Sequence, residues 1–138
     1  MNYKSEMNLL SPFGPKLGKV TLDNELVKSI REDIDDILQN QNRTPYGEYL
    51  AGQITTEILI PEIYDNIYDL FLTVSEQYAT QVYNYAGYSE TDQKLLEGKI
   101  NEVWIVEQIA GEYNPVHTHD GCNVSGILYL QIPEYPKR

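Results

Sequence analysis

The amino-acid sequence predicts an α+β fold in which helices come first and antiparallel strands come last. Apolar residues recur every three or four positions through much of residues 23–86, which is the spacing of a buried helix face. From Glu102 onward, apolar and polar residues alternate, and this period of two indicates strands over residues 101–132. This order indicates one α+β domain, and 138 residues are enough for a single domain with a core.

The helical region is expected to contain two helices. An irregular segment, residues 8–22, precedes them, is broken by prolines and glycines, and ends in a short strand over residues 19–22. Asp23 is the expected N-cap of the first helix, because its side chain can accept from free N–H groups of the first turn. Pro61 is expected to open the second helix, where its missing N–H costs nothing. The stripes expected to be buried are Leu26, Val27, Ile30, Ile34, Ile37 and Leu38 in the first helix, and Ile63, Ile67, Leu70, Phe71, Val74, Tyr78 and Val82 in the second.

Loops are expected over residues 44–60, with strand-like pieces, and over residues 87–101. The first strand of the strand region follows Glu102 and places Val103 and Ile105 on one face. Gly111 and Glu112 are expected to form a turn. Residues 124–132 are apolar and rich in β-forming side chains, so we expect a buried strand that ends before Pro133.

The charge of the chain excludes some classes of partner. With 10 basic and 21 acidic residues, the net charge is −11, whereas duplex nucleic acid and anionic membranes require a positive surface. We therefore expect neither a nucleic-acid partner nor a membrane partner. The single cysteine, Cys122, excludes an internal disulfide bond and indicates a reducing compartment. The first residues lack the apolar stretch of a secretion signal, so a cytoplasmic location is expected.

The two histidines of the chain lie one residue apart and are followed by a carboxylate. In an extended segment, His117 and His119 point to the same side, and Gly121 allows a turn that could bring Asp120 to them. Two imidazoles and an acid with open positions favour Fe(II), Mn(II) or Zn(II) in a reactive site over a structural zinc site. The alternative is a pair of surface histidines without a ligand.

The residues around the histidines resemble a family. Trp104 and Gln108, then Tyr113–Gly121 (YNPVHTHDG) and Ser125–Pro133 (SGILYLQIP), are similar to the 2-oxoglutarate- and Fe(II)-dependent oxygenases of marine bacteria and cyanophages. The resemblance covers about residues 102–134. It implies a bacterial or phage-infected host cytoplasm and a core that is a double-stranded β-helix, or jelly roll, against which the N-terminal helices pack.

The same resemblance implies roles for individual residues. His117 and His119 would bind Fe(II), and Asp120 would serve as a substitute ligand or as an acid beside the metal. The cosubstrate 2-oxoglutarate would chelate the iron through its keto acid, with Gln108 and Tyr129 as contacts. Hydroxylation of a small molecule or of a protein side chain would be the reaction.

Members of this family carry a later iron-binding histidine and an arginine that pairs with the distal carboxylate of 2-oxoglutarate. No histidine follows His119 here, and the only arginine after it is Arg138. A jelly roll also needs about eight strands. We therefore expect residues 1–138 to be the N-terminal part of an oxygenase jelly roll and to be inactive as they stand.

Two other interpretations of the histidine segment remain open. Cupins share the jelly roll and place a glycine six residues before the first histidine of His-x-His, as Gly111 stands before His117. They also carry a glutamate at the position that corresponds to 123 or 124. This chain has Asn123 and Val124 there, so the glutamate is missing. A cupin-type metal-binding protein is therefore one alternative. The other is a degenerate, non-enzymatic phage module with a structural or interaction role, in which the tyrosine-rich helices form the contact surface.

Overall fold

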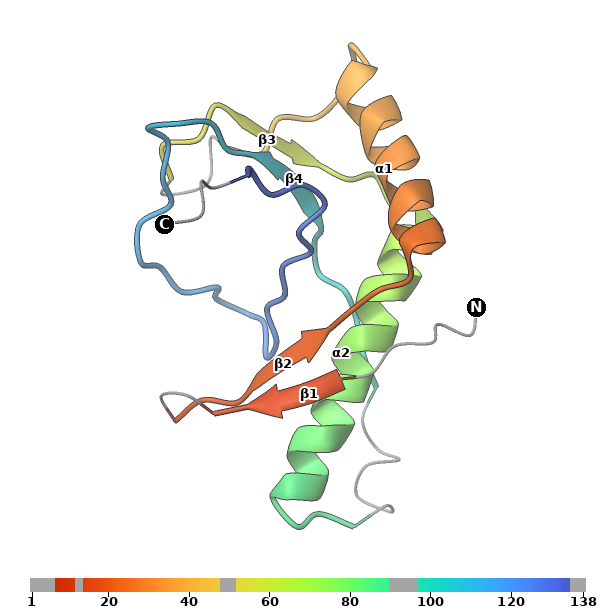
Figure 1. Cartoon of the computed structure of the whole chain (residues 1–138), viewed down its shortest axis with the longest axis vertical. Coiled ribbons are helices and arrows are strands. Elements are labelled where there is room, and N and C mark those ends of the chain that lie inside the picture. Colours follow the sequence, from red (N-terminus) through yellow and green to blue (C-terminus); the bar gives the residue numbers. More distant parts are fainter. Residues whose placement is uncertain (1–6, 12–13, 48–51, 90–96, 135–138) are drawn as a thin grey trace.

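The computed structural model describes residues 7–11, 14–47, 52–89 and 97–134. In chain order its elements are β1 (Met7–Leu10), β2 (Leu17–Val20), α1 (Asn24–Gln39), β3 (Thr56–Leu59), α2 (Asp65–Tyr85) and β4 (Trp104–Glu107). The strands form two antiparallel pairs, β1 with β2 and β3 with β4. Both helices lie along one side of the molecule, and the loop that follows β4 lies on the other side (Figure 1). The mixture of helices and antiparallel strands confirms an α+β fold, but the predicted order, helices first and strands last, is wrong, because β1, β2 and β3 all precede α2. The jelly roll stays a prediction.

Helix α1 forms as the sequence predicts. The Asp23 carboxylate accepts a hydrogen bond from the Glu25 backbone N–H at 2.8 Å and so caps the first turn. Ile30, Ile34 and Ile37 are the buried residues of this helix, while most of its acidic residues lie exposed on the opposite face.

Helix α2 begins later than predicted. Ile60 still continues the sheet, because its N–H donates to the Val103 carbonyl at 2.9 Å, and the chain must turn before a helix can start. Pro61 therefore opens a turn, closed by the Tyr64 N–H to the Pro61 carbonyl, and the helix begins at Asp65. The prediction that Ile63 is buried is wrong, since its side chain is 84 % exposed.

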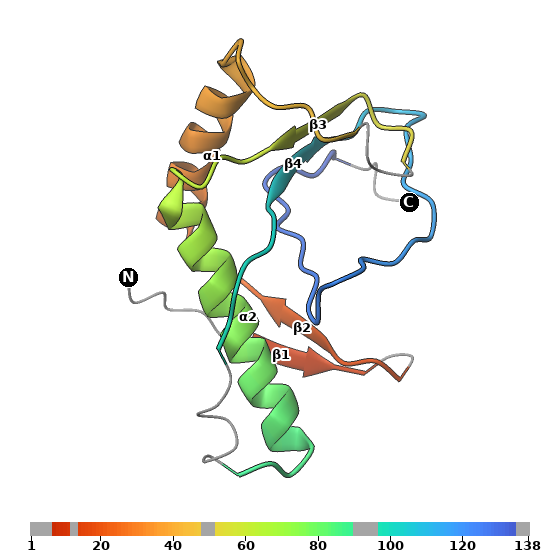
Figure 2. The same cartoon turned by 180° about the vertical axis from the view of Figure 1, so that it is seen from behind.

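The segment that precedes α1 is a hairpin and not the irregular lead-in that was predicted. Met7 pairs with Val20 and Leu10 with Leu17, so the predicted strand at residues 19–22 is shifted by two residues and has a partner. The hairpin rests on α2, where the Tyr78 hydroxyl donates to the Lys16 carbonyl at 2.8 Å. Seen from behind, α2 runs along most of the length of the molecule and passes this hairpin (Figure 2).

The core lies between the two helices and the β3–β4 sheet. In this sheet Ile58 pairs with Ile105 and Leu59 with Trp104. Residues 44–46 extend the sheet beyond β3, because the Tyr46 N–H donates to the Glu57 carbonyl and the Leu59 N–H donates to the Thr44 carbonyl. The buried apolar residues are Ile30, Ile34, Ile37, Ile58, Ile60, Ile67, Leu70, Val103 and Ile105.

The predicted strand over residues 124–132 is not formed. Leu128 and Leu130 pack against the core while Ile127 and Tyr129 are exposed, so the alternation expected of a strand is present. A strand also needs a neighbour, and in the described part of the chain no backbone hydrogen bond joins these residues to another segment. The Arg31 side chain holds this stretch to α1 through the Leu130 carbonyl and the Gln131 side chain. None of the described helices is both long and apolar enough to cross a membrane.

Candidate functional site

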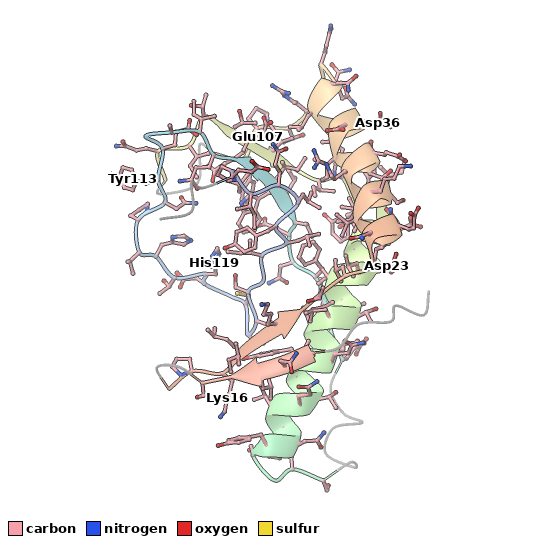
Figure 3. All side chains as sticks on the ribbon, viewed as in Figure 1. Lys16, Asp23, Asp36, Glu107, Tyr113 and His119 are labelled. Atoms are coloured by element: carbon pink, nitrogen blue, oxygen red, sulfur yellow. The ribbon has the colours of Figure 1, made fainter. Side chains whose placement is uncertain are left out.

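The two histidines lie in the wide loop that leaves β4 and curves back toward the sheet. Glu107 ends the strand, and Tyr113 and His119 follow one another around the loop (Figure 3). Gly111 has φ of +94°, a left-handed conformation that glycine adopts without strain, and the turn there is closed by the Glu112 N–H to the Ile109 carbonyl. The predicted turn therefore directs the chain toward the histidines.

The loop is attached to the segment before β3. The Gln53 N–H donates to the Tyr113 carbonyl at 2.9 Å, and the Glu112 carboxylate accepts from the Thr55 N–H and the Ile109 N–H, each at 2.9 Å, and from the Thr55 hydroxyl. These hydrogen bonds lower the pKa of the Glu112 carboxyl. Gly52 packs so closely that a Cβ there would overlap the Asn114 side-chain oxygen.

Beyond the histidines, the Asn101 amide donates to the Gly121 carbonyl at 3.0 Å, and the Cys122 thiol lies 3.4 Å from the His119 carbonyl. The histidine segment is thus fixed at both of its ends. Fixed ends favour one geometry for the two rings, although both side chains are exposed.

The imidazoles of His117 and His119 face each other. Their Nε2 atoms are 3.1 Å apart, and the ring centroids are 4.7 Å apart at 70°. His117 Nδ1 lies 2.7 Å from the Pro115 carbonyl oxygen, which only accepts hydrogen bonds, so Nδ1 carries the proton. This tautomer leaves the lone pair of His117 Nε2 directed toward His119.

The separation of the two nitrogens matches the spacing of adjacent metal ligands. Two nitrogens that each lie about 2.1 Å from one ion, at right angles to each other, are about 3.0 Å apart. The 3.1 Å observed between the Nε2 atoms is close to this value. The same distance is that of a hydrogen bond, which His119 Nε2–H donates to His117 Nε2 when His117 carries its proton on Nδ1. Metal binding by the pair stays a prediction.

An aromatic row connects the pair to the sheet. The His119 ring lies 5.8 Å from the Trp104 ring, and the Trp104 ring lies 5.1 Å from the Tyr46 ring. The Tyr46 hydroxyl donates to the Glu102 carboxylate, which raises the pKa of Tyr46 to about 12. Tyr46 therefore stays protonated at neutral pH, and the histidines sit beside a neutral aromatic surface.

Sequence reasoning missed Glu57, the buried carboxylate of the sheet. Glu57 is 2 % exposed, and neither of its carboxylate oxygens has a hydrogen-bond partner. Its pKa is raised, first by burial and then by the negative charge of Glu112, while a positive charge on His117 lowers it. The one signal in the sequence is an acid inside the apolar run before Pro61.

The other predicted site residues are exposed. The Gln108 amide donates to the Glu112 carbonyl at 2.7 Å, Tyr129 is 69 % exposed, and Asp120 is also exposed. In the part of the chain that the structure describes, no three His, Cys, Asp or Glu side chains form a group that could hold a metal ion. The structure thus brings two of the predicted ligands together and leaves the third position to be assigned.

No protein-family model, curated protein or solved structure matches this chain.

Proposed function

We propose that the chain binds Fe(II) through His117 and His119 and contributes this site to a 2-oxoglutarate-dependent oxygenase of the hydroxylase type. The observation that supports this most directly is the 3.1 Å separation of the two Nε2 atoms. Imidazole nitrogens suit Fe(II), and two of them with open positions leave room for a cosubstrate.

The surroundings of the pair support the proposal. The Pro115 carbonyl accepts the His117 Nδ1 proton, which is how proteins usually orient a histidine that binds a metal. Trp104 supports one side of His119 and reduces its freedom to turn away. Both imidazoles are exposed, so an ion and a cosubstrate can reach them.

His117 and His119 would hold the metal ion and 2-oxoglutarate would chelate it through its keto acid, and the ion would supply oxidising chemistry to a substrate bound beside it. Gln108 and Tyr129 are proposed as contacts to the cosubstrate, and Asp120 is a candidate for the acid near the metal. The proposed substrate is a small molecule or a protein side chain.

Release of succinate from 2-oxoglutarate in the presence of Fe(II) and O₂ tests this function. We expect turnover by the full-length protein and its loss in His117→Ala, because one of the two nitrogens is then missing. Thr118→Ala is the matched control, since Thr118 lies between the histidines, is exposed and offers no nitrogen. Undiminished turnover in His117→Ala would contradict the proposal.

The exposed apolar side chains of residues 124–132 favour a second candidate, an interaction module without enzymatic activity. Ile127, Tyr129 and Ile132 are 76 %, 69 % and 63 % exposed, although they belong to the most strand-like part of the sequence. This module would bind neither Fe(II) nor 2-oxoglutarate. A cupin-type protein would bind a metal ion without consuming 2-oxoglutarate, so the same measurements separate the three candidates.

A further inference from the structure

We propose that Glu57 is a pH-sensitive switch: residues 44–47 stay packed on β3 while its carboxyl group is neutral, and they open when this group ionises. These residues extend the sheet beyond β3 and carry Tyr46, whose ring contacts Trp104 in the aromatic row. The inference goes beyond the proposed function, because it concerns the sheet itself and needs no metal ion.

The first observation is the state of the carboxyl group. Glu57 is 2 % exposed, and neither of its carboxylate oxygens has a hydrogen-bond partner. A neutral carboxyl group tolerates such surroundings better than a carboxylate, because a charge loses far more hydration energy on burial. Burial is accordingly the largest cause that raises the pKa of Glu57. The closed structure therefore favours the protonated acid.

The second observation is the segment that covers the carboxyl group. A Cβ at Gly47 would lie 2.8 Å from Glu57 Oε2 and 3.4 Å from Glu57 Cβ, so the Gly47 backbone packs directly on this side chain. Gly47 is itself partly exposed, so a movement of this residue gives the carboxyl group access to water. The segment is attached to β3 by backbone hydrogen bonds, from the Tyr46 N–H to the Glu57 carbonyl at 2.8 Å and from the Leu59 N–H to the Thr44 carbonyl at 3.0 Å.

The third observation is the charge of the groups around Glu57. In the loop after β4, the negative charge of Glu112 raises the pKa of Glu57 further, whereas a positive charge on His117 lowers it. On β4, the residue that pairs with Glu57 is Val106, which has no charge. In residues 44–47 the titratable group is Tyr46, which stays neutral because its pKa is about 12. None of these groups is a cation once His117 is neutral, so the carboxylate must reach water to be stabilised.

Opening the segment costs less than keeping a buried carboxylate. The Tyr46 ring leaves Trp104, and the Tyr46 N–H exchanges the Glu57 carbonyl for water. Both losses are modest, because water replaces the hydrogen bond, whereas an unpaired buried carboxylate lacks its whole hydration. For an acid whose pKa is raised, the closed form is complete below the ordinary value of 4.5 and is lost as the pH rises through the raised value. Since Trp104 also contacts His119, opening changes the surroundings of the histidine pair.

Fluorescence of the metal-free protein tests the switch, because Trp104 is the single tryptophan of the chain. We expect quenching of Trp104 by acrylamide to increase between pH 4.5 and about pH 9, since Tyr46 leaves the indole ring as Glu57 ionises. Glu57→Gln keeps the shape of the neutral acid and should lose this transition. Glu107→Gln is the matched control and should keep it, because it removes an exposed carboxylate from the same sheet.

Hydrogen exchange of the Tyr46 amide gives a second readout. Its protection, relative to exchange in an unfolded chain, should fall over the same pH range in the unaltered protein and stay constant in Glu57→Gln. His119 also contacts Trp104, but its titration contributes to the fluorescence of both proteins and cancels in their difference. The switch is wrong if Glu57→Gln shows a fluorescence transition of the same size, or if the protection of Tyr46 in the unaltered protein is independent of pH. If Glu57→Gln does not fold, Glu57→Met replaces it, because an apolar side chain of similar length also removes the titrating group.

Discussion

His117 owes its orientation to a single backbone group. The Pro115 carbonyl accepts from Nδ1 at 2.7 Å, and this contact fixes both the tautomer and the direction of Nε2. The contact is local, since it joins residues two positions apart. The orientation of His117 therefore depends on a few neighbouring residues, and the metal-binding role proposed for the pair could be predicted from the sequence for that reason.

Glu57 could not be identified in the same way. Its burial depends on the pairing of β3 with β4 and of residues 44–46 with β3. Neither pairing follows from the spacing of residues in the sequence. Asp120 was predicted as the acid of the site because it is adjacent to His119.

Glu112 gives the stability of the protein a defined dependence on pH. Hydrogen bonds from Thr55 and Ile109 hold the pKa of this carboxyl below its ordinary value of 4.5. Its contribution to the free energy of unfolding is therefore complete well above pH 4.5 and is lost as the pH falls through the lowered value. Urea unfolding between pH 7 and pH 2 should show Glu112→Gln less stable than the unaltered protein at pH 7, with a difference that shrinks in acid. A difference independent of pH would contradict this role.

At the scale of elements, the contact between the histidine loop and the segment before β3 depends on Gly52, which packs against Asn114. A Cβ there would overlap the exposed Asn114 side chain, so Gly52→Ala must displace at least the end of that side chain. We expect a loss of about 0.5–1 kcal/mol in the free energy of unfolding. Gly126→Ala is the matched control, because no atom lies within 4 Å of its added Cβ. Equal urea midpoints for the two variants would show that the packing of Gly52 against Asn114 does not contribute to the stability of the protein.

The start of α2 can be tested with two isoleucines. Ile67 is 1 % exposed in the core, whereas Ile63 is 84 % exposed in the turn before the helix. Ile67→Ala should lower the free energy of unfolding by about 2–5 kcal/mol, and Ile63→Ala should change it by less than about 0.5 kcal/mol. Urea unfolding of the two variants measures both. A large loss from Ile63→Ala would mean that the helix begins at Pro61 after all.

The elements differ in how far the sequence could predict them. Helix α1 was predicted because its cap and its apolar stripe are both local features. The strand over residues 124–132 was predicted from alternation alone, but a strand forms only when a neighbouring strand offers its backbone groups. The pairing of β1 with β2 was missed for the converse reason, since Met7–Leu10 has little alternation and is ordered by its partner and by α2.

At the scale of the whole molecule, the site lies where the sheet faces away from the helices. One face of β3 and β4 packs against α1 and α2 and forms the core, and the other face carries Glu57 and Trp104 under the histidine loop. The net charge of −11 favours cations at such a site. The fold thus supplies a rigid support on one side and an accessible loop on the other.

Equilibrium binding of Fe(II) under anaerobic conditions tests the central claim, that His117 and His119 together hold a metal ion. We expect one ion per chain and a loss of affinity of at least about 100-fold in the double variant His117→Ala/His119→Ala, with Thr118→Ala unchanged. Binding of Fe(II) by the double variant with the affinity of the unaltered protein would contradict it.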